Sequence, residues 1–479
     1  MPKGSPLSRE PSVREPGRDI LPHGGTLPRA APRRAPIISS SAALMTRARH
    51  PDRRYPGSSP DGSRPAPIRF TPGESRLSSS TNRHDLWAPE ARANPLPVYA
   101  RMRQEAPFVR LFDPYYKNPV WVATRYKDAV ELMRDPRFTK DVRKLPDSSP
   151  TKQKRSGENG VFNQHMLSAD PPDHTRLRTL VSKAFTPRRV EELRPRITAI
   201  SHRLLDAVQA NGSMDLLDAY AFPLPVTVIA EMLGVPQEDQ DQFREWTNIV
   251  VNPPLDGNME AIQKAGFQFA QYFQGMMARR RTEPRDDLLS ALLAVEEQGD
   301  RLTPAELISM LFLLLVAGHE TTVNLIGNGV WALLNHPEQL ERLRANPALI
   351  ESAVEEMLRF RGPVETSTQR WATEELEFRG QVIPAGESVV ASLLAADHDP
   401  EHFPEPERFD ITREPNRHIA FGFGIHFCLG APLARLEGTI AINLLLERMP
   451  RLRFAEDPAR LRWRDGILVN GLQHLPVAF

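Results

Sequence analysis

The chain has 479 residues, of which 40% are hydrophobic and 25% charged, as expected of a globular protein with a large core. Its formal net charge is +1 and it contains one cysteine, Cys428, which excludes an internal disulfide. No apolar run approaches the roughly 20 residues of a membrane-spanning helix, so we expect no membrane span. The nearly balanced charge gives no reason to expect nucleic-acid binding.

Residues 1–80 differ in composition from the rest of the chain. They carry fourteen Lys or Arg against six Asp or Glu, and they hold 14 of the 46 prolines. Such a segment cannot bury enough apolar surface to offset its chain entropy, so we expect a disordered extension. It is either a flexible tail, an upstream start of the reading frame or a targeting peptide. Its prolines argue against a targeting peptide, because they oppose the amphipathic helix that such a peptide forms. Residues 81–479 are expected to form a single domain, mostly helical with minor β-structure.

Residues 170–178 read Asp-Pro-Pro-Asp-His-Thr-Arg-Leu-Arg and contain a basic pair. His174 and Arg178 are four residues apart, so on a helix they share one face. An imidazole and a guanidinium in this arrangement suit an anionic ligand. The alternative is a pair of solvated surface charges.

The clearest predicted helix starts with a capping box at Thr303-Pro-Ala-Glu306 and continues to about residue 335. At 1.5 Å per residue it is about 48 Å long, enough to cross a domain. One face carries an apolar stripe that ends in an acid and an alcohol, and its members include Leu313, Leu314, Ala317, Glu320 and Thr321. A buried carboxyl is costly without a partner or a chemical task, so this stripe is more than a core face.

A second helix contains Glu356 and Arg359, which are three residues apart and form a common helix salt-bridge pattern. Arg408 follows in the segment Pro406-Glu-Arg-Phe409. By itself the Glu356–Arg359 pair indicates no more than such a helix salt bridge.

The only cysteine lies in the run Phe-Gly-Phe-Gly-Ile-His-Phe-Cys-Leu-Gly at positions 421–430. A helical pattern begins after Cys428, so its sulfur would lie at a helix N-terminus, where unpaired N–H groups favour a thiolate. A free cysteine is more often a small buried hydrophobe. The surrounding glycines instead indicate close approach to a flat ligand.

In their residue types and order, these motifs resemble those of the cytochrome P450 family. The haem-loop pattern Phe-x-x-Gly-x-His-x-Cys-x-Gly is matched at Phe421, Gly424, His426, Cys428 and Gly430. Residues 317–322, Ala-Gly-His-Glu-Thr-Thr, resemble the family's oxygen-activation motif. The resemblance implies a mainly α fold with a long central helix over haem b (iron protoporphyrin IX). It is closest to the soluble bacterial members, so we expect a cytoplasmic monomer.

The resemblance also implies a role for each matched residue. Cys428 would be the proximal ligand of the haem iron, while Glu320 and Thr321 would supply and position protons for O2 cleavage beside Ala317 and Gly318. His174, Arg178, Arg370 and His426 would bind the haem propionates. Glu356, Arg359 and Arg408 would form a buried charge cluster that stabilises the fold, in which loss of one partner would strand a buried charge. The expected substrate pocket comprises Leu313, Leu314, Ala317, Val364 and Leu472.

The implied activity is O2-dependent hydroxylation or epoxidation of an apolar small molecule of the steroid, terpenoid, fatty-acid or macrolide type. Gly422-Phe-Gly424 lacks the third glycine of a dinucleotide fingerprint, so a ferredoxin and its reductase are the expected electron donors. The ferredoxin is expected to dock on basic residues such as Arg176, Lys183, Arg188 and Arg435. The alternatives are a haem-thiolate carrier or sensor without turnover, against which the acid–alcohol pair argues, and a cofactor-free protein with a structural cysteine.

Overall fold

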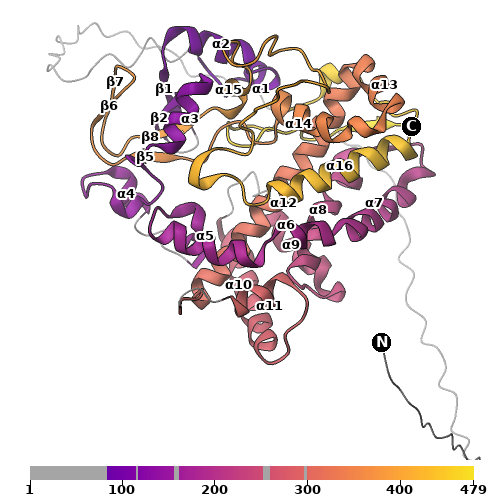
Figure 1. Ribbon diagram of the computed structural model, residues 1–479, viewed down its shortest axis with the longest axis horizontal. Helices are drawn as coiled ribbons and strands as arrows, with labels where there is room; N and C mark the ends of the chain where they lie inside the picture. The colour runs from indigo at the N-terminus through magenta and orange to yellow at the C-terminus, as the bar shows by residue number, and fades with distance from the viewer. Residues whose placement is uncertain (1–83, 115–116, 156–160, 252–258, 296–298) are drawn as a thin grey trace, which may run out of the picture. The chain divides into compact units, whose positions relative to one another are not determined.

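The computed structural model describes residues 84–479 except 115–116, 156–160, 252–258 and 296–298. The expectation for residues 1–80 lies outside the described residues. The mainly helical fold with minor β-structure is confirmed (Figure 1). The helices are α1 Pro89–Ala93, α2 Leu96–Glu105, α3 Tyr126–Arg134, α4 Pro150–Arg155, α5 Asp173–Ala184, α6 Pro187–Glu192, α7 Arg194–Gln209, α8 Pro223–Met232, α9 Gln240–Val251, α10 Met259–Thr282, α11 Leu288–Ala294, α12 Pro304–Asn335, α13 Pro337–Ala345, α14 Ile350–Arg361, α15 Leu393–Asp397 and α16 Ala431–Arg448.

The described strands form three small sheets. They are β1 Phe108–Asp113, β2 Asn118–Ala123, β3 Phe138–Thr139, β4 Ser213–Asp215, β5 Arg370–Ala372, β6 Leu376–Phe378, β7 Gln381–Ile383, β8 Ser388–Ala391, β9 Arg453–Phe454 and β10 Pro476–Ala478. The largest sheet has the order β1-β2-β8-β5-β3, in which only the β2–β8 pair is parallel. This sheet joins segments that are far apart in sequence, so residues near position 140 and residues near position 370 lie together.

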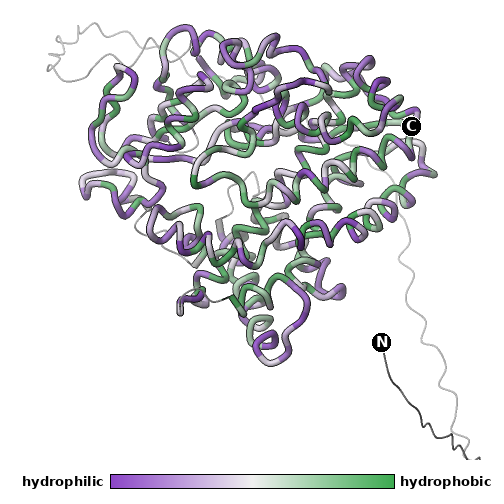
Figure 2. The backbone as a smooth tube through the Cα atoms, in the orientation of Figure 1, coloured by the Kyte–Doolittle hydropathy of each residue, from purple (hydrophilic) through white to green (hydrophobic). Residues whose placement is uncertain are grey.

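Helix α12 begins at the predicted capping box. The Thr303 hydroxyl accepts a hydrogen bond from the Glu306 N–H at 3.2 Å, and the Glu306 carboxylate accepts one from the Thr303 N–H at 2.8 Å. By length and composition α12 could cross a membrane, but 56% of its most apolar window is buried inside the protein. Apolar residues follow the inner elements and hydrophilic residues the periphery (Figure 2). Helix α12 is therefore placed as a core helix.

Helices α14 and α16 both pack on α12. The approach of α16 is close at Gly438, where an added Cβ would lie 2.9 Å from Cδ2 of Leu325 on α12. A larger residue at this position would force the Leu325 side chain to move within a close-packed core. This packing connects α12 to the cysteine loop, since α16 starts three residues after Cys428.

Buried charges join α14 to the loop that precedes the cysteine. Arg359 donates two hydrogen bonds of 2.8 Å to the carboxylate of Glu356, and both side chains are fully buried. The predicted third member of this cluster, Arg408, is wrong. Its side chain is 57% exposed and pairs with Glu405, and only its backbone carbonyl accepts from Arg359. Arg413 occupies the expected place instead, with its Nε 3.2 Å from Glu356.

The loop geometry explains this difference. The backbone N–H of Asp410 and the side-chain amide of Asn416 both donate to Glu356, so the loop wraps around that carboxylate. Arg413 lies on the inner side of the wrapped loop, whereas the Arg408 side chain points outward. The spacing of a flexible loop in the sequence does not reveal which of its arginines faces inward.

We expect Arg413→Gln to lower the free energy of unfolding by about 1–3 kcal/mol, because it leaves part of a buried carboxylate unpaired. Arg408→Gln, at an exposed site, should cost no more than about 0.5 kcal/mol. Urea unfolding of both variants measures the difference. Equal losses, or a larger loss for Arg408→Gln, would contradict the assignment.

Candidate functional site

The cysteine loop is held in a tight conformation ahead of α16. The Cys428 N–H donates to the Phe421 carbonyl at 3.0 Å and closes the loop. Gly424 has φ +76°, and a Cβ there would lie 3.1 Å from the carbonyl oxygen of Met133, so glycine is required on both counts. The short 3-10 helix η8 (Gly424–His426) then brings His426 and Cys428 to the same side as α5.

The Cys428 thiol lies in an environment with two opposing effects. Burial raises its pKa, while backbone N–H groups of Gly430 and Ala431 and the charge of Arg178 favour the thiolate. In the protein alone burial is the larger effect, so the depressed pKa predicted from the helix N-terminus is not reached. A bound metal removes the thiol proton outright, and these N–H donors would then hold the sulfur as a thiolate.

Basic side chains gather around His426, two residues before this sulfur. The ring of His174 lies edge-on to the ring of His426 at 4.4 Å between centroids. Burial lowers the pKa of His426 to about 2, and the charges of Lys140, Arg370, His174 and Arg178 contribute in the same direction. Neither ring nitrogen of the buried His174 has a hydrogen-bond partner among the described residues. We call these five residues the cation cluster, after its lysine and two arginines; the His426 imidazole is neutral at pH 7.

The cation cluster is poorly compensated within the protein. Arg370 is buried, which lowers its pKa to about 10, and its nearest opposing charge is Asp170. Asp170 is already engaged by the Thr139 hydroxyl and by the Lys140 N–H at 3.0 Å. No carboxylate of the described residues pairs with Arg178 or Arg370 within 4.0 Å. A buried cluster of this kind requires an external anion.

A haem fits these donors. Its two carboxylates match the cation cluster, and its iron matches a lone thiol with backbone donors beside it. Gly430 lies beside the sulfur, where a Cβ would be 3.8 Å from Cys428 Sγ, an ordinary van der Waals distance. The structure therefore brings together Cys428, His174, Arg178, Arg370, His426 and the two loop glycines Gly424 and Gly430. Phe421 packs beside them, with the Arg435 guanidinium 4.5 Å from its ring centroid.

The middle of α12 has one face that is not packed. Ala317 is exposed although it lies in a core helix, and Leu313, Leu314, Gly318, Glu320 and Thr321 are only partly buried. The Thr321 hydroxyl donates to the Ala317 carbonyl at 2.8 Å. His319 points the other way, buried against the ring of Phe222. The exposed face therefore carries the acid and the alcohol.

Glu320 is held by an arginine from the C-terminal loop. Arg464 Nη1 donates to Glu320 Oε1 at 2.5 Å. Burial raises the pKa of Glu320 above its usual range, and Arg464 partly opposes that rise. The carboxyl is thus a partly buried acid whose protonation depends on one guanidinium.

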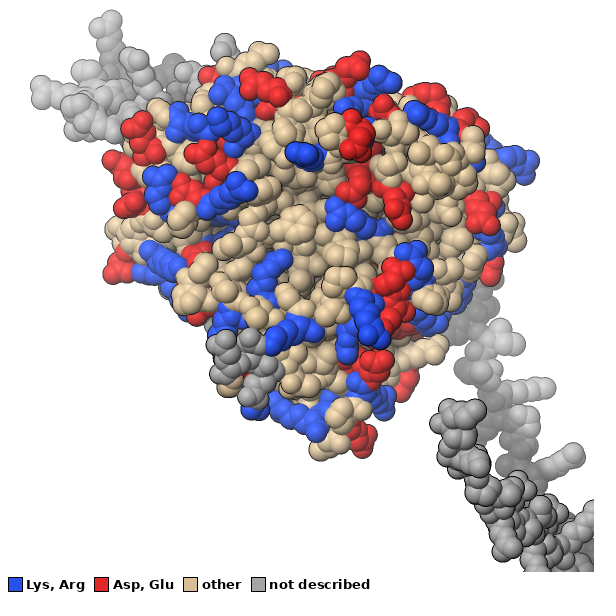
Figure 3. All heavy atoms as spheres, in the orientation of Figure 1, with Lys and Arg blue, Asp and Glu red and all other residues tan. Residues whose placement is uncertain are grey.

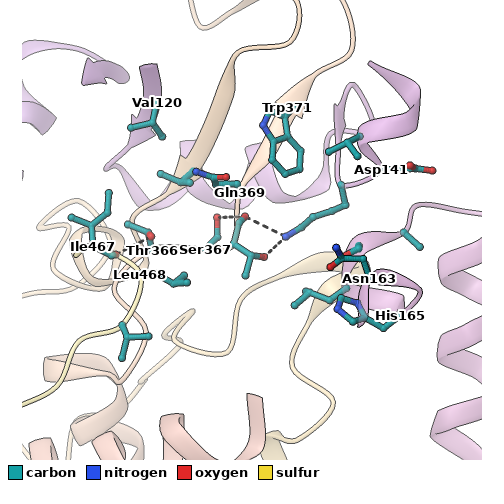
Figure 4. Close-up of a pocket in the computed structure, with 18 of the residues that line it drawn as sticks. Val120, Asp141, Asn163, His165, Thr366, Ser367, Gln369, Trp371, Ile467 and Leu468 are labelled. Atoms are coloured by element: carbon teal, nitrogen blue, oxygen red, sulfur yellow. Dashed lines mark hydrogen bonds between the residues drawn. The ribbon is translucent and has the colours of Figure 1, made fainter. Parts of the chain in front are cut away.

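A cavity of about 1560 Å³ extends from Lys140 to Glu320. Its wall also includes His165, residues 366–369 and residues 467–469, and several of these side chains surround the open space in Figure 4. The predicted pocket residues Leu313, Leu314, Ala317, Val364 and Leu472 are not among its lining. Leu472 corrects the expectation most clearly. It is 1% exposed and bridges Trp463 in the core, so Ile467, Leu468 and Val469 face the cavity in its place.

Two residues of this site were missed by the sequence reasoning. Lys140 has no motif of its own, and Arg464 lies 144 residues from Glu320. The only available signal for Lys140 was its place after a strand-like stretch, and for Arg464 there was none. Lys140 is brought to the site because the strand before it pairs with β5, and Arg464 reaches the site through its hydrogen bond to Glu320. Both contacts join segments that are far apart in the sequence.

Comparisons with known proteins agree with this geometry. A profile described as Cytochrome P450 matches residues 213–452. Cytochrome P450 107B1 of Saccharopolyspora erythraea is 50% identical over 388 residues, covering 79% of this chain and 93% of that protein. Vitamin D(3) 25-hydroxylase of Pseudonocardia autotrophica is 48% identical over 402 residues, covering 83% and 97%. The crystal structure of myxobacterial cytochrome P450 CYP267B1 in complex with myristic acid aligns with a TM-score of 0.77 and 51% identity, covering 82% of this chain and 98% of that one.

We expect Arg464→Met to raise the pKa of the Glu320 carboxyl, because the guanidinium that favours its charged form is lost while burial persists. Infrared difference titration, with Glu320→Gln used to assign the band, measures this pKa. Arg462→Met removes an exposed positive charge two residues away and serves as the control. An unchanged Glu320 pKa in Arg464→Met would refute the coupling.

Proposed function

The chain belongs to the cytochrome P450 family and is a haem-thiolate monooxygenase that binds haem b, and we propose that it hydroxylates or epoxidises an apolar small molecule with electrons from a ferredoxin and its reductase. The observation that supports turnover is the pairing of Glu320 and Thr321 on the unpacked face of α12. A protein that only carries a ligand has no use for a partly buried acid beside an alcohol.

We assign the residues as follows. Cys428 is the proximal ligand, and Glu320 and Thr321 are the catalytic pair. His174, Arg178, Arg370 and His426 hold the haem carboxylates. Ala317 and Gly318 leave space above the ring, with Phe421, Gly424 and Gly430 framing the sulfur. Glu356, Arg359 and Arg413 hold the loop that carries the cysteine.

When bound, the thiolate-ligated haem supplies the oxidising chemistry that cleaves O2 and places one oxygen atom in a substrate bond. The protein must deliver two protons to the distal side. Glu320 can hold a proton at the cavity wall because burial raises its pKa. Thr321 is the residue after Glu320. Its hydroxyl can accept or donate a hydrogen bond there once it turns away from the Ala317 carbonyl.

The substrate proposal rests on the size of the cavity and on the relatives. A cavity of about 1560 Å³ has room for a large ligand. Relatives include Vitamin D(3) 25-hydroxylase, 6-deoxyerythronolide B hydroxylase and a cytochrome P450 whose structure is in complex with myristic acid. We propose a substrate of steroid, terpenoid, fatty-acid or macrolide type, acted on by a cytoplasmic monomer.

The ferredoxin proposal rests on the basic residues near the cysteine loop. Arg435 lies next to this loop and pairs with Glu355 at 2.7 Å, and Arg188 pairs with Glu192 at 3.0 Å. The face in Figure 3 shows basic side chains interspersed with acidic ones, without a large region of a single sign. Docking by a few specific basic contacts suits such a surface better than steering by a broad field.

A reduced carbon-monoxide spectrum of the purified protein, followed by turnover with ferredoxin, reductase and a substrate library, tests the proposed function. A thiolate band with product that depends on O2 and ferredoxin would support it. A thiolate band without product under any donor would favour the alternative, a haem-thiolate carrier or sensor. Loss of the band in Cys428→Ser is the control for the ligand.

We expect Thr321→Val to lower the rate of product formation by about 10²-fold, because proton delivery loses its positioned hydroxyl. Product formed per NAD(P)H consumed reports the loss directly. Thr322→Val removes the adjacent hydroxyl, which is buried and donates to the Gly318 carbonyl at 3.3 Å, and should stay within roughly twofold of wild type. Equal effects of the two substitutions would contradict the assigned role.

A further inference from the structure

Lys140 is a buried lysine to which no motif assigns a role. Its side chain is 5% exposed, and its Nζ contacts the Thr368 hydroxyl and, at 3.2 Å, the Thr368 carbonyl. Both of these partners are neutral. An ammonium group that is buried with only neutral partners is costly, so an anion is missing from its surroundings.

The β3–β5 ladder places this lysine beside a haem-carboxylate arginine. The pairs are Phe138 with Ala372 and Thr139 with Trp371, so the next pair in the same register is Lys140 with Arg370. Residues directly opposite in an antiparallel pair project to the same face, with Cβ atoms about 4.5–5.5 Å apart. Two like charges in this arrangement repel each other unless an anion lies between them.

The surrounding charges agree with this placement. The neighbouring acid Asp170 accepts from the Lys140 backbone N–H and from the Thr139 hydroxyl, and it also pairs with Lys144 at 3.2 Å. Asp170 is therefore already engaged by other donors, and among the described residues no carboxylate forms a salt bridge with the Lys140 ammonium within 4.0 Å.

We propose that Lys140 is a further haem-binding residue, whose ammonium pairs with the propionate that Arg370 and His426 also bind. The inference rests on the proposed haem site. When the haem is bound, Nζ exchanges its neutral partner Thr368 for a carboxylate, and the repulsion across the β3–β5 ladder is relieved. Because Lys140 also lines the cavity, an acidic substrate is a second source of a carboxylate for it. The experiment below separates an acidic substrate from the haem propionate.

The test is the rate of haem loss from the holoenzyme to excess apomyoglobin. Lys140→Met and Lys140→Gln should lose haem about tenfold faster than wild type, because a charge-assisted contact is removed. Lys140→Arg should retain most of the affinity. Lys152→Met, which removes a lysine paired with the exposed Asp147, is the matched control and should match wild type.

Two further measurements make the outcome specific. With the dimethyl ester of the haem, wild type and Lys140→Gln should differ by less than twofold, because the carboxylate is gone. If the Lys140 variants lose haem no faster than Lys152→Met and show a normal thiolate band, this inference is overturned and the proposed function stays intact. The same would follow if the Lys140 variants lost only their preference for a fatty acid over its methyl ester, read from the haem spin-state shift.

Discussion

The packing of α12 against α16 is the constraint on which the site depends. One helix carries the acid and the alcohol, and the other follows directly from the cysteine loop. Their close approach at Gly438 and Leu325 sets how far apart these two halves lie. Core packing tolerates little change in volume, so this spacing is rigid. The exposed face around Ala317 therefore lies on a helix whose other faces are well packed.

Charge is handled in two different ways in this fold. Around Glu356 every charged group has a partner, and the Arg359 guanidinium donates to a carboxylate and to three backbone carbonyls. Around the cysteine loop the buried cations outnumber the acids. The first arrangement is complete within the protein and stabilises the loop. The second is incomplete within the protein, and in the proposed assignment the two carboxylates of the cofactor would complete it, which would link haem binding to the folding of this region.

The cavity connects these charges to the acid on α12. Lys140 lies at one part of its wall and Glu320 at another, and Arg464 reaches Glu320 from the C-terminal loop. Segments near residues 140, 320, 368 and 464 therefore meet in one space. A change in the C-terminal loop can alter the protonation of Glu320 without touching α12. With Glu320 in its proposed role, this coupling would give the loop an influence on proton delivery as well as on the shape of the cavity.

The sequence by itself determined the family, the haem ligand Cys428, the acid–alcohol pair and both ends of α12. These features are local, because a capping box, a helical repeat and a loop motif are each written in a few neighbouring residues. Only the tertiary structure decided which arginine completes the cluster around Glu356, which residue of the C-terminal loop faces the cavity, and which partners Lys140 and Glu320 have. Those choices depend on how loops fold back and on strand register between distant segments, and neither is encoded in local spacing.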